Sequence, residues 1–244
     1  YGITLQTIYR LTKGTLTSGF SGSLGNIDRR GHINKDGLDS YMFSKDKLSA
    51  LNLTFYAQYH YPFSNRFHFI GNIQAAHNQR NSEDVFPNPE LRPWYSHSSH
   101  RYRYFFSQPI SKDQSFRAIN PRIGAIYNGG SKKDFQFFAN ASTSYEPPTF
   151  DELVGTGVTD NINTSPKKLF AIELKKQSAV TAELGSRYEG SQYSWNLSFY
   201  RSWIKNELLE VKDFVLGVKE TQNYPHTIHQ GIEFGFVAAP FKRL

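Results

Sequence analysis

Apolar residues occupy every second position in segment after segment of this chain. From Phe135 to Tyr145 the odd positions carry Phe, Phe, Ala, Ala, Thr and Tyr, whereas most even positions are polar. From Tyr193 to Trp203 the apolar residues again fall mostly on odd positions. Successive side chains of a β-strand point to opposite faces, so each segment has one apolar face and one polar face. The pattern predicts a chain built from strands.

Short and long connections alternate between these segments. Gly, Pro, Asn and Ser in the connections supply the chemistry of turns. The long connections are 26–47, 78–115, 146–179 and 211–226. The predicted strands are Tyr1–Arg10, Leu16–Gly25, Leu48–His60, Phe67–His77, Phe116–Tyr127, Phe135–Tyr145, Val180–Glu189, Tyr193–Glu210 and Thr227–Ala238.

This alternation of connections indicates an all-β antiparallel meander that forms part of a transmembrane β-barrel, about nine strands of a larger ring. The short connections are then periplasmic turns, and the long ones are extracellular loops. Trp195 and Trp203, on one apolar face, are separated by about 20 Å along the membrane normal, close to the height of a lipid-facing band. An aromatic girdle is predicted beside the short turns, from Tyr59, Tyr61, Phe63, Phe67, Tyr127 and Phe135. A soluble β-sandwich or propeller is the alternative, but such folds rarely use long loops so regularly.

Composition narrows the possible functions of the 244 residues. Only 38% of them are hydrophobic, and no run approaches the 18 apolar residues of a membrane helix. The chain has no cysteine, which excludes disulfides, thiolate metal sites and a cysteine nucleophile. The net charge of +7 is scattered over turns and strands rather than gathered on one face, so nucleic acid is not an expected partner. The chain opens within one strand pattern and closes just after another, so we expect a fragment of a longer protein.

Four motifs in order resemble one known family. Residues 120–127 read NPRIGAIY, and residues 137–153 read FFANASTSYEPPTFDEL. They are followed by VTAELGSRYE at 180–189 and HQGIEFG at 229–235. In this order and at hairpin spacing, the motifs resemble the barrel strands of TonB-dependent outer-membrane receptors.

The resemblance implies a barrel of about 22 strands with a plugged lumen. Residues 1–244 would then be a fragment of the barrel domain, without the plug domain and the C-terminal strands. Members of the family import scarce nutrients across the outer membrane of Gram-negative bacteria, mostly ferric siderophores and also haem, cobalamin and glycans. The implied partners are the TonB complex, which acts through the plug, and a ferric chelate or another small molecule.

The connection 78–115 carries most of the candidate binding chemistry. Trp94, Arg101, Tyr102, Arg103 and Tyr104 place cations among aromatic rings, which suits an anionic, aromatic ligand such as a catecholate siderophore. The alternatives are an ordinary loop or a strand that continues above the membrane. His97 and His100 would suit haem or a metal, but a His pair in a loop is more often solvated, so neither a metal site nor a cofactor is predicted.

Charges on the polar strand faces are expected to point into the lumen. They are Arg122, Glu183, Arg187 and Glu233. Such charges need partners, either on the plug and along the solute path or on neighbouring strands, and the sequence leaves both open. Asn52, Asn140 and Asn196 also read as lumen lining rather than glycosylation sites.

The rim motif after residue 146 reads as structural. Pro147 and Pro148 fix two φ angles and end a strand. Asp151 and Glu152 are expected to shape the loop, since no base or nucleophile accompanies them.

Arg201 lies in the lipid-facing set between Phe199 and Trp203. An arginine fork suits phosphate, so membrane lipid, specifically lipopolysaccharide, is its expected partner. The leading functional prediction is therefore a TonB-energised receptor for a scarce nutrient, with an outer-membrane enzyme and a soluble β-rich binding module as the alternatives. No hydrolase, P-loop or dinucleotide motif supports an enzyme.

Overall fold

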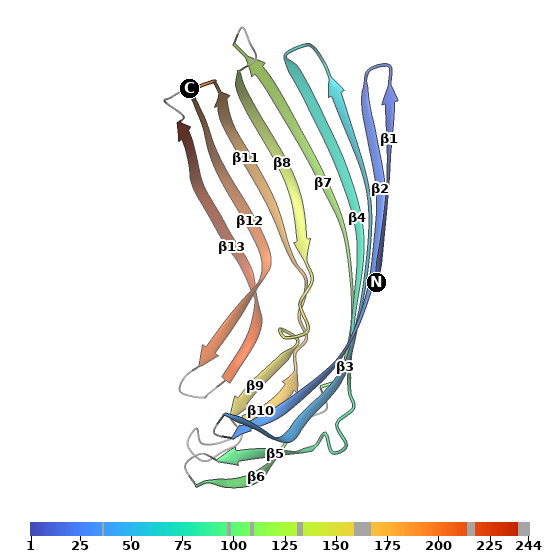
Figure 1. Ribbon diagram of the computed structural model, residues 1–244, viewed down its shortest axis with the longest axis vertical. Helices are drawn as coiled ribbons and strands as arrows, with labels where there is room; N and C mark the ends of the chain where they lie inside the picture. The colour runs from blue at the N-terminus through green and yellow to red at the C-terminus, as the bar shows by residue number, and fades with distance from the viewer. Residues whose placement is uncertain are drawn as a thin grey trace, which may run out of the picture.

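A computed structural model describes residues 1–35, 37–96, 99–107, 110–130, 134–158, 167–213 and 218–238. Nine strands of this described part form one antiparallel meander in which each pairs with the next. The sheet curves from β1 at one end to β13 at the other (Figure 1). No helix among the described residues is long and apolar enough to span a bilayer. The nine strands are β1 (Gly2–Leu11), β2 (Gly14–Lys35), β3 (Leu38–Pro62), β4 (Phe67–Asp84), β7 (Lys112–Gly129), β8 (Phe135–Glu146), β11 (Gln177–Glu189), β12 (Tyr193–Asp213) and β13 (Val218–Ala238).

The register confirms the two faces read from the sequence. Residues directly opposite each other in an antiparallel pair share a face. Ile123 lies opposite Ala141, and Phe199 lies opposite both Leu184 and Ile232. Ile123 and Ile232 are each 67% exposed, far more apolar surface than a soluble sheet leaves in water. This apolar face is the lipid-facing side of the wall, and the opposite polar face lines the lumen.

Aromatic rings gather at the short-turn end of the sheet, as predicted. The rings of Phe67 and Tyr127 lie 4.7 Å apart, and those of Phe135 and Trp195 lie 5.5 Å apart. We call these rings, which include Phe67, Tyr127, Phe135 and Trp195, the short-turn girdle.

The tight β1–β2 turn at this end needs Gly14, because its φ is +105° and a Cβ there would collide with the carbonyl oxygen of His60.

Two of the predicted long loops are wrong, because the strands continue through them. Strands β2 and β3 pair as far as Lys35 and Leu38, inside the predicted loop 26–47. Likewise β12 and β13 pair as far as Asp213 and Val218, inside the predicted loop 211–226. Backbone hydrogen bonds extend these hairpins beyond the bilayer, where no lipid requires alternate side chains to be apolar. The connections 85–111 and 147–176 remain long, as predicted.

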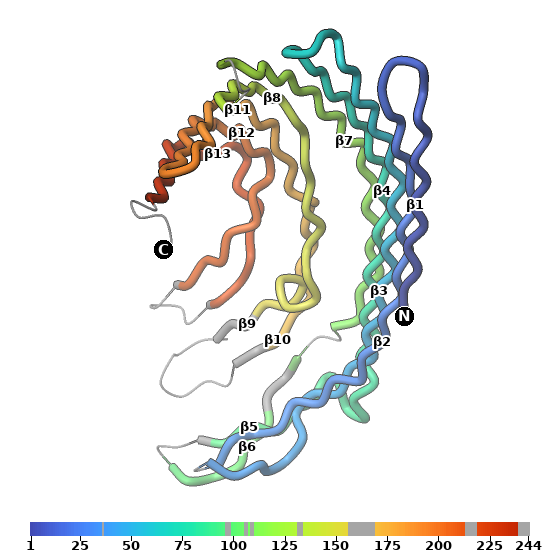
Figure 2. Tube along the Cα trace, turned by 45° about the horizontal axis from the view of Figure 1, so that its top comes forward, coloured from blue at the N-terminus to red at the C-terminus, as the bar shows by residue number. Residues whose placement is uncertain are grey.

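The long connections carry small hairpins of their own. Strands β5 (Leu91–Ser96) and β6 (Arg101–Phe106) pair with each other, and so do β9 (Val154–Val158) and β10 (Lys167–Ala171). Figure 2 shows both hairpins at the end of the sheet that lies away from the short turns. Most of the buried apolar side chains, among them Leu48, Ile110, Leu153 and Leu174, also lie at this end. The core therefore sits in an outer tier above the single-layered wall. We define the outer tier as the distal halves of β2 and β3, the end of β4, and the described residues of the connections 85–111 and 147–176 with their hairpins β5–β6 and β9–β10.

Candidate ligand-binding rim

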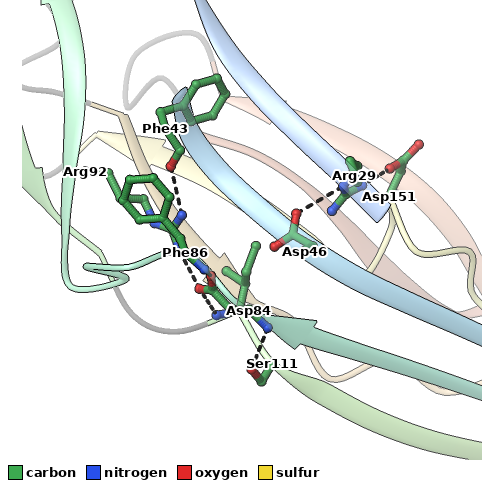
Figure 3. A network of polar contacts seen from close by, with 9 residues as sticks. Arg29, Phe43, Asp46, Asp84, Phe86, Arg92, Ser111 and Asp151 are labelled. Atoms are coloured by element: carbon green, nitrogen blue, oxygen red, sulfur yellow. Dashed lines mark hydrogen bonds and ion pairs between the residues drawn. The ribbon is translucent and has the colours of Figure 1, made fainter. Parts of the chain in front are cut away.

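A buried ion pair fixes the β5–β6 hairpin to the rim of the wall (Figure 3). The guanidinium of Arg92 pairs with the carboxylate of Asp84, and neither side chain has any exposed surface. Arg92 also donates a 2.8 Å hydrogen bond from Nη1 to the carbonyl oxygen of Phe43 on β3. Its guanidinium lies 5.0 Å from the ring centroid of Phe86. Arg92 therefore ties the hairpin to β3 and to the end of β4.

Asp84 also holds both ends of the connection between β4 and β7. Its Oδ1 accepts a hydrogen bond from the backbone N–H of Phe86 at 3.2 Å, and its Oδ2 accepts one from the N–H of Ile110 at 3.2 Å. The backbone N–H of Asp84 donates to Oγ of Ser111 at 2.9 Å. One carboxylate thus closes a segment of more than twenty residues at its base, an arrangement that the sequence did not suggest.

Arg29 of β2 makes a second link within the outer tier (Figure 3). Its Nε lies 3.2 Å from Oδ2 of Asp46 on β3, and its Nη1 lies 2.7 Å from Oδ1 of Asp151. Burial raises the pKa of Asp46, while the positive charge of Arg29 acts in the opposite direction. Asp46 is 1% exposed, and its Oδ1 is buried without a hydrogen-bond partner among the described residues.

The rim motif at residues 147–153 has a local fold of its own. Glu152 accepts hydrogen bonds from the backbone N–H of Thr149 at 2.6 Å and from its hydroxyl at 2.9 Å. The N–H of Glu152 donates back to that hydroxyl at 3.4 Å, which makes a reciprocal box. Strand β8 ends at Glu146, and Pro148 is fully buried. Asp151 faces Arg29 while Glu152 faces Thr149, so the geometry favours the loop-shaping interpretation of this acidic pair.

The hairpin divides the five predicted ligand residues between its two faces. Trp94 lies opposite Arg103, and Tyr95 lies opposite Tyr102. Because strand faces alternate, Trp94, Arg101 and Arg103 share one face, and Tyr102 and Tyr104 share the other. The structure does not bring the alternating Arg and Tyr side chains together as one set.

The tyrosine face of the hairpin packs against the tip of the β2–β3 hairpin. The ring of Tyr102 lies 4.7 Å from Tyr41 and 5.1 Å from Tyr95, and its hydroxyl is hydrogen-bonded to Ser40. Lys35 places its ammonium 5.6 Å from the ring of Tyr95 and 5.8 Å from that of Tyr102. Tyr102 is therefore engaged within the chain, and sequence reasoning missed Lys35, which no motif marks.

The opposite face of the hairpin is open to solvent. Arg101 and Arg103 are exposed, and Trp94, on β5 opposite Arg103, is half-buried. Tyr104 is 65% exposed at the edge of the tyrosine face. We call Trp94, Arg101 and Arg103 the cationic face.

The predicted histidine pair lies only partly within the described residues. His97 lies outside them, and His100 has a φ of +51° and a ring nitrogen 3.3 Å from the hydroxyl of Tyr95. Within the described ranges, no three His, Cys, Asp or Glu residues are grouped so as to hold a metal ion.

Three of the four predicted lumen charges share one hollow on the polar face. Arg122, Glu183 and Arg187 line a cavity of about 380 Å³ together with uncharged residues of β3, β4, β7 and β8. Glu183 accepts a 2.8 Å hydrogen bond from the amide of Asn140. Glu233 lies on β13, opposite Ser198. Among the described residues, none of the four charges forms an ion pair.

A polar network on the lumen side lies nearer the outer tier. Oδ1 of Asn52 accepts hydrogen bonds from the amide of Asn78 at 2.7 Å and from Arg80 at 2.8 Å. Tyr145 lies at an odd, lipid-side position of β8, beyond the end of the β7–β8 pairing, and its hydroxyl donates to the side chain of Asn78. Asn52 and Asn140 thus serve as lumen lining, as expected, and Asn196 lies opposite Arg187 on the same face. Sequence reasoning missed Arg80 and Tyr145.

The comparisons with known proteins identify the family of this wall. The family described as "TonB dependent receptor-like, beta-barrel" matches residues 2–242, nearly the whole chain. The chain belongs to this family. A search of curated proteins found no match.

Solved structures share the fold of this TonB-dependent receptor barrel. The ferric yersiniabactin uptake receptor FyuA from Yersinia pestis is 13% identical, with a TM-score of 0.64 over 96% of this chain and 32% of its own. The copper transporter OprC is 14% identical, with a TM-score of 0.70 over 98% and 35%. The ferric-catecholate import receptor Fiu from E. coli K12 is 15% identical, with a TM-score of 0.63 over 97% and 34%. The chain thus spans about one third of the length of these structures.

Membership fixes the location of the protein and its class. TonB-dependent receptors are transport receptors of the Gram-negative outer membrane and not enzymes. The lipid-facing surface of the sheet is therefore in the outer membrane. Arg201 lies on this surface between Ala182 and Gln230, with its guanidinium 5.3 Å from the ring centroid of Trp203.

Proposed function

We propose that the intact receptor imports a ferric siderophore, that this chain supplies part of the barrel wall, and that the cationic face of the β5–β6 hairpin makes the first contact with the ligand. The observation that carries the proposal is the pairing of Arg103 with Trp94 on an exposed face of the outer tier. Ferric siderophores combine negative charge with apolar or aromatic groups, which guanidinium and indole groups bind together.

The anchoring of the hairpin supports this role. The buried Asp84–Arg92 pair and the packing of Tyr102 on Tyr41 hold the cationic face in one orientation. A rigid face loses less conformational entropy on binding than a free loop does. The structural neighbours FyuA and Fiu are named for ferric chelates, which is consistent with the same substrate class.

The mechanism that we propose is transport without chemistry. The ligand binds above the plug, and the TonB complex then rearranges the plug with energy from the inner membrane. We propose that Arg122, Arg187, Glu183 and Glu233 meet the plug or the passing solute, since they project into the lumen without ion pairs among the described residues. On this account Asp151 and Glu152 shape the rim, and no cofactor takes part.

The binding step is tested with an intact receptor that carries Arg101→Ser and Arg103→Ser together. Uptake of radiolabelled ferric chelates is measured for a catecholate, a phenolate, a hydroxamate and haem. We expect the apparent affinity of uptake for one of the three siderophores to fall about ten-fold or more, because two cations contact an anionic ligand. The matched control is Arg66→Ser, which removes an exposed cation at the short-turn rim. Unchanged uptake of all four compounds by the double variant would refute the role of this face, and a loss confined to haem would replace the siderophore with haem.

The lumen charges are tested by a different readout. Arg122→Glu is expected to leave ligand binding to intact cells unchanged while reducing TonB-dependent uptake, because it reverses a charge on the lumen face. Equal loss of binding and uptake would instead place Arg122 in the ligand site.

A further inference from the structure

A second group of basic side chains lies on the lipid-facing side of the wall, away from the cationic face. His77 of β4 and Arg117 of β7 are direct cross-strand partners on the apolar face. Lys176, just before β11, donates a hydrogen bond from its ammonium to the carbonyl oxygen of Arg117. Its ammonium also lies 5.4 Å from the ring centroid of Tyr145. We call His77, Arg117 and Lys176 the basic rim cluster.

The cluster lies at the height of lipid headgroups in the outer leaflet. Arg117 is ten residues along β7 from Tyr127 of the short-turn girdle, and His77 is ten residues along β4 from Phe67. At about 3.3 Å per residue and a tilt near 40°, ten residues rise about 25 Å, which is the height of the apolar band of such barrels. Basic groups at this level meet phosphates rather than acyl chains.

An apolar groove adjoins the basic rim cluster. Leu53, Phe55, Ala75 and Ile119 line it together with the three basic residues, and its volume is about 730 Å³. Leu53 lies opposite His77, and Phe55 opposite Ala75, so the lining belongs to the lipid-facing side. The groove thus joins an acyl-compatible wall to a cationic end.

A break in the strand pairing adjoins the groove. Pairing of β7 with β8 stops at Arg122 and Ser142, whereas pairing of β7 with β4 continues to Lys112. Figure 1 shows β8 leaving β7 in the half of the wall nearer the outer tier. Among the described residues, the side chain of Lys176 bridges to β7 beyond this point.

The charge of the groove selects an anion. No carboxylate is among the described residues that line it. Nδ1 of His77 is buried and has no hydrogen-bond partner among the described residues. A phosphate supplies acceptors for histidine, arginine and lysine donors at once.

We propose that this groove binds a phosphorylated, acylated lipid of the outer leaflet, with its phosphate on the basic rim cluster and an acyl chain along Leu53, Phe55 and Ile119. This site is separate from Arg201, which lies on β12. A lipid held here covers the break between β7 and β8 on the membrane side.

The test uses the intact receptor, extracted from outer membranes in mild detergent and analysed by native mass spectrometry. The variant is Arg117→Gln with Lys176→Gln, and the matched control is Lys13→Gln with Arg66→Gln, which removes the same charge at the short-turn rim. Titration with diphosphorylated lipid A should show about thirty-fold weaker binding for the groove variant and no change for the control. Heat-modifiable mobility in SDS gels shows that each variant is folded, and the single change Lys176→Gln serves if the double variant is not.

Three further arms test the acyl groove and the source of the phosphate. Dephosphorylated lipid A should bind wild type and variant equally weakly. Ala75→Phe should fill the groove and weaken lipid A binding. Equal binding of lipid A by wild type and the groove variant would overturn the proposal. So would displacement of lipid A by millimolar inorganic phosphate, because the cluster would then be a site for soluble phosphate.

Discussion

Removal of the Asp84 carboxylate should release the β5–β6 hairpin while the membrane wall stays folded. In Asp84→Ala the guanidinium of Arg92 loses its counter-ion, although it has no exposed surface. The backbone N–H groups of Phe86 and Ile110 lose their acceptor as well. Loss of one partner from a buried ion pair costs about 3–5 kcal/mol.

The expected acceleration of hydrogen exchange follows from how often the β5–β6 hairpin opens. A cost of 3–5 kcal/mol raises the open fraction of the hairpin about 150-fold to 5000-fold. Hydrogen exchange followed by mass spectrometry, on the receptor in detergent, should show this acceleration in residues 91–96 and 99–106. The paired segments of β3 and β4 nearer the short turns should exchange as slowly as in the wild type, because their ladders do not depend on Asp84.

Two comparisons isolate the mechanism. Asp113→Ala removes an exposed carboxylate that accepts one 3.3 Å hydrogen bond from Gln79, so its effect should stay within about 1 kcal/mol. Arg92→Met should cost less than Asp84→Ala, because Asp84 retains its backbone donors. Unchanged exchange of the hairpin in Asp84→Ala would refute the view that this pair anchors it.

Three further predictions concern other parts of the chain. Because burial raises the pKa of Asp46, its own contribution to the stability of the outer tier should be present in full below the ordinary carboxyl range and be lost as the pH rises through the raised pKa. Proteolysis of the tier over a pH series, compared between wild type and Asp46→Asn, isolates this contribution, and identical pH profiles would contradict it. Gly185→Ala should destabilise the wall by about 1–3 kcal/mol, because its Cβ would meet a phenylalanine ring of β8 and a β12 carbonyl, whereas the Cβ of Gly71→Ala would meet nothing. Urea unfolding midpoints compare the two variants, and equal midpoints would refute the close packing around Gly185. Glu152→Ala should cost about 1 kcal/mol and speed protease cleavage within residues 147–153, while the conservative Gln change should cost less; equal cleavage rates would argue against the reciprocal box.

The membrane-spanning part of the fold could be predicted because lipid imposes a repeating pattern on it. Every outward position between the two interfaces must be apolar, so alternation marks each strand, as in residues 135–145. Beyond the bilayer that requirement ends. The polar run from Asn26 to Lys35 shows no alternation, yet it is strand, because its backbone pairs with residues 38–49.

The ion pairs of the outer tier could not be predicted for another reason. The Asp84–Arg92 pair and the links from Arg29 to Asp46 and Asp151 join residues up to 122 positions apart, which no local pattern marks. The alternation rule, applied to residues 101–104, would have separated the arginines from the tyrosines. Composition alone groups this run, so it identifies the residue types but not their division between two faces.

If the wall is oriented as we propose, the β5–β6 hairpin lies outside the cell and the short turns lie in the periplasm. The chain has no cysteine, so one introduced cysteine is the single labelling site once any others in the intact receptor are replaced. In intact cells, a membrane-impermeant maleimide should label Tyr104→Cys fully and Arg66→Cys only after the outer membrane is permeabilised. Labelling of Arg66→Cys in intact cells, with Tyr104→Cys protected, would contradict the account.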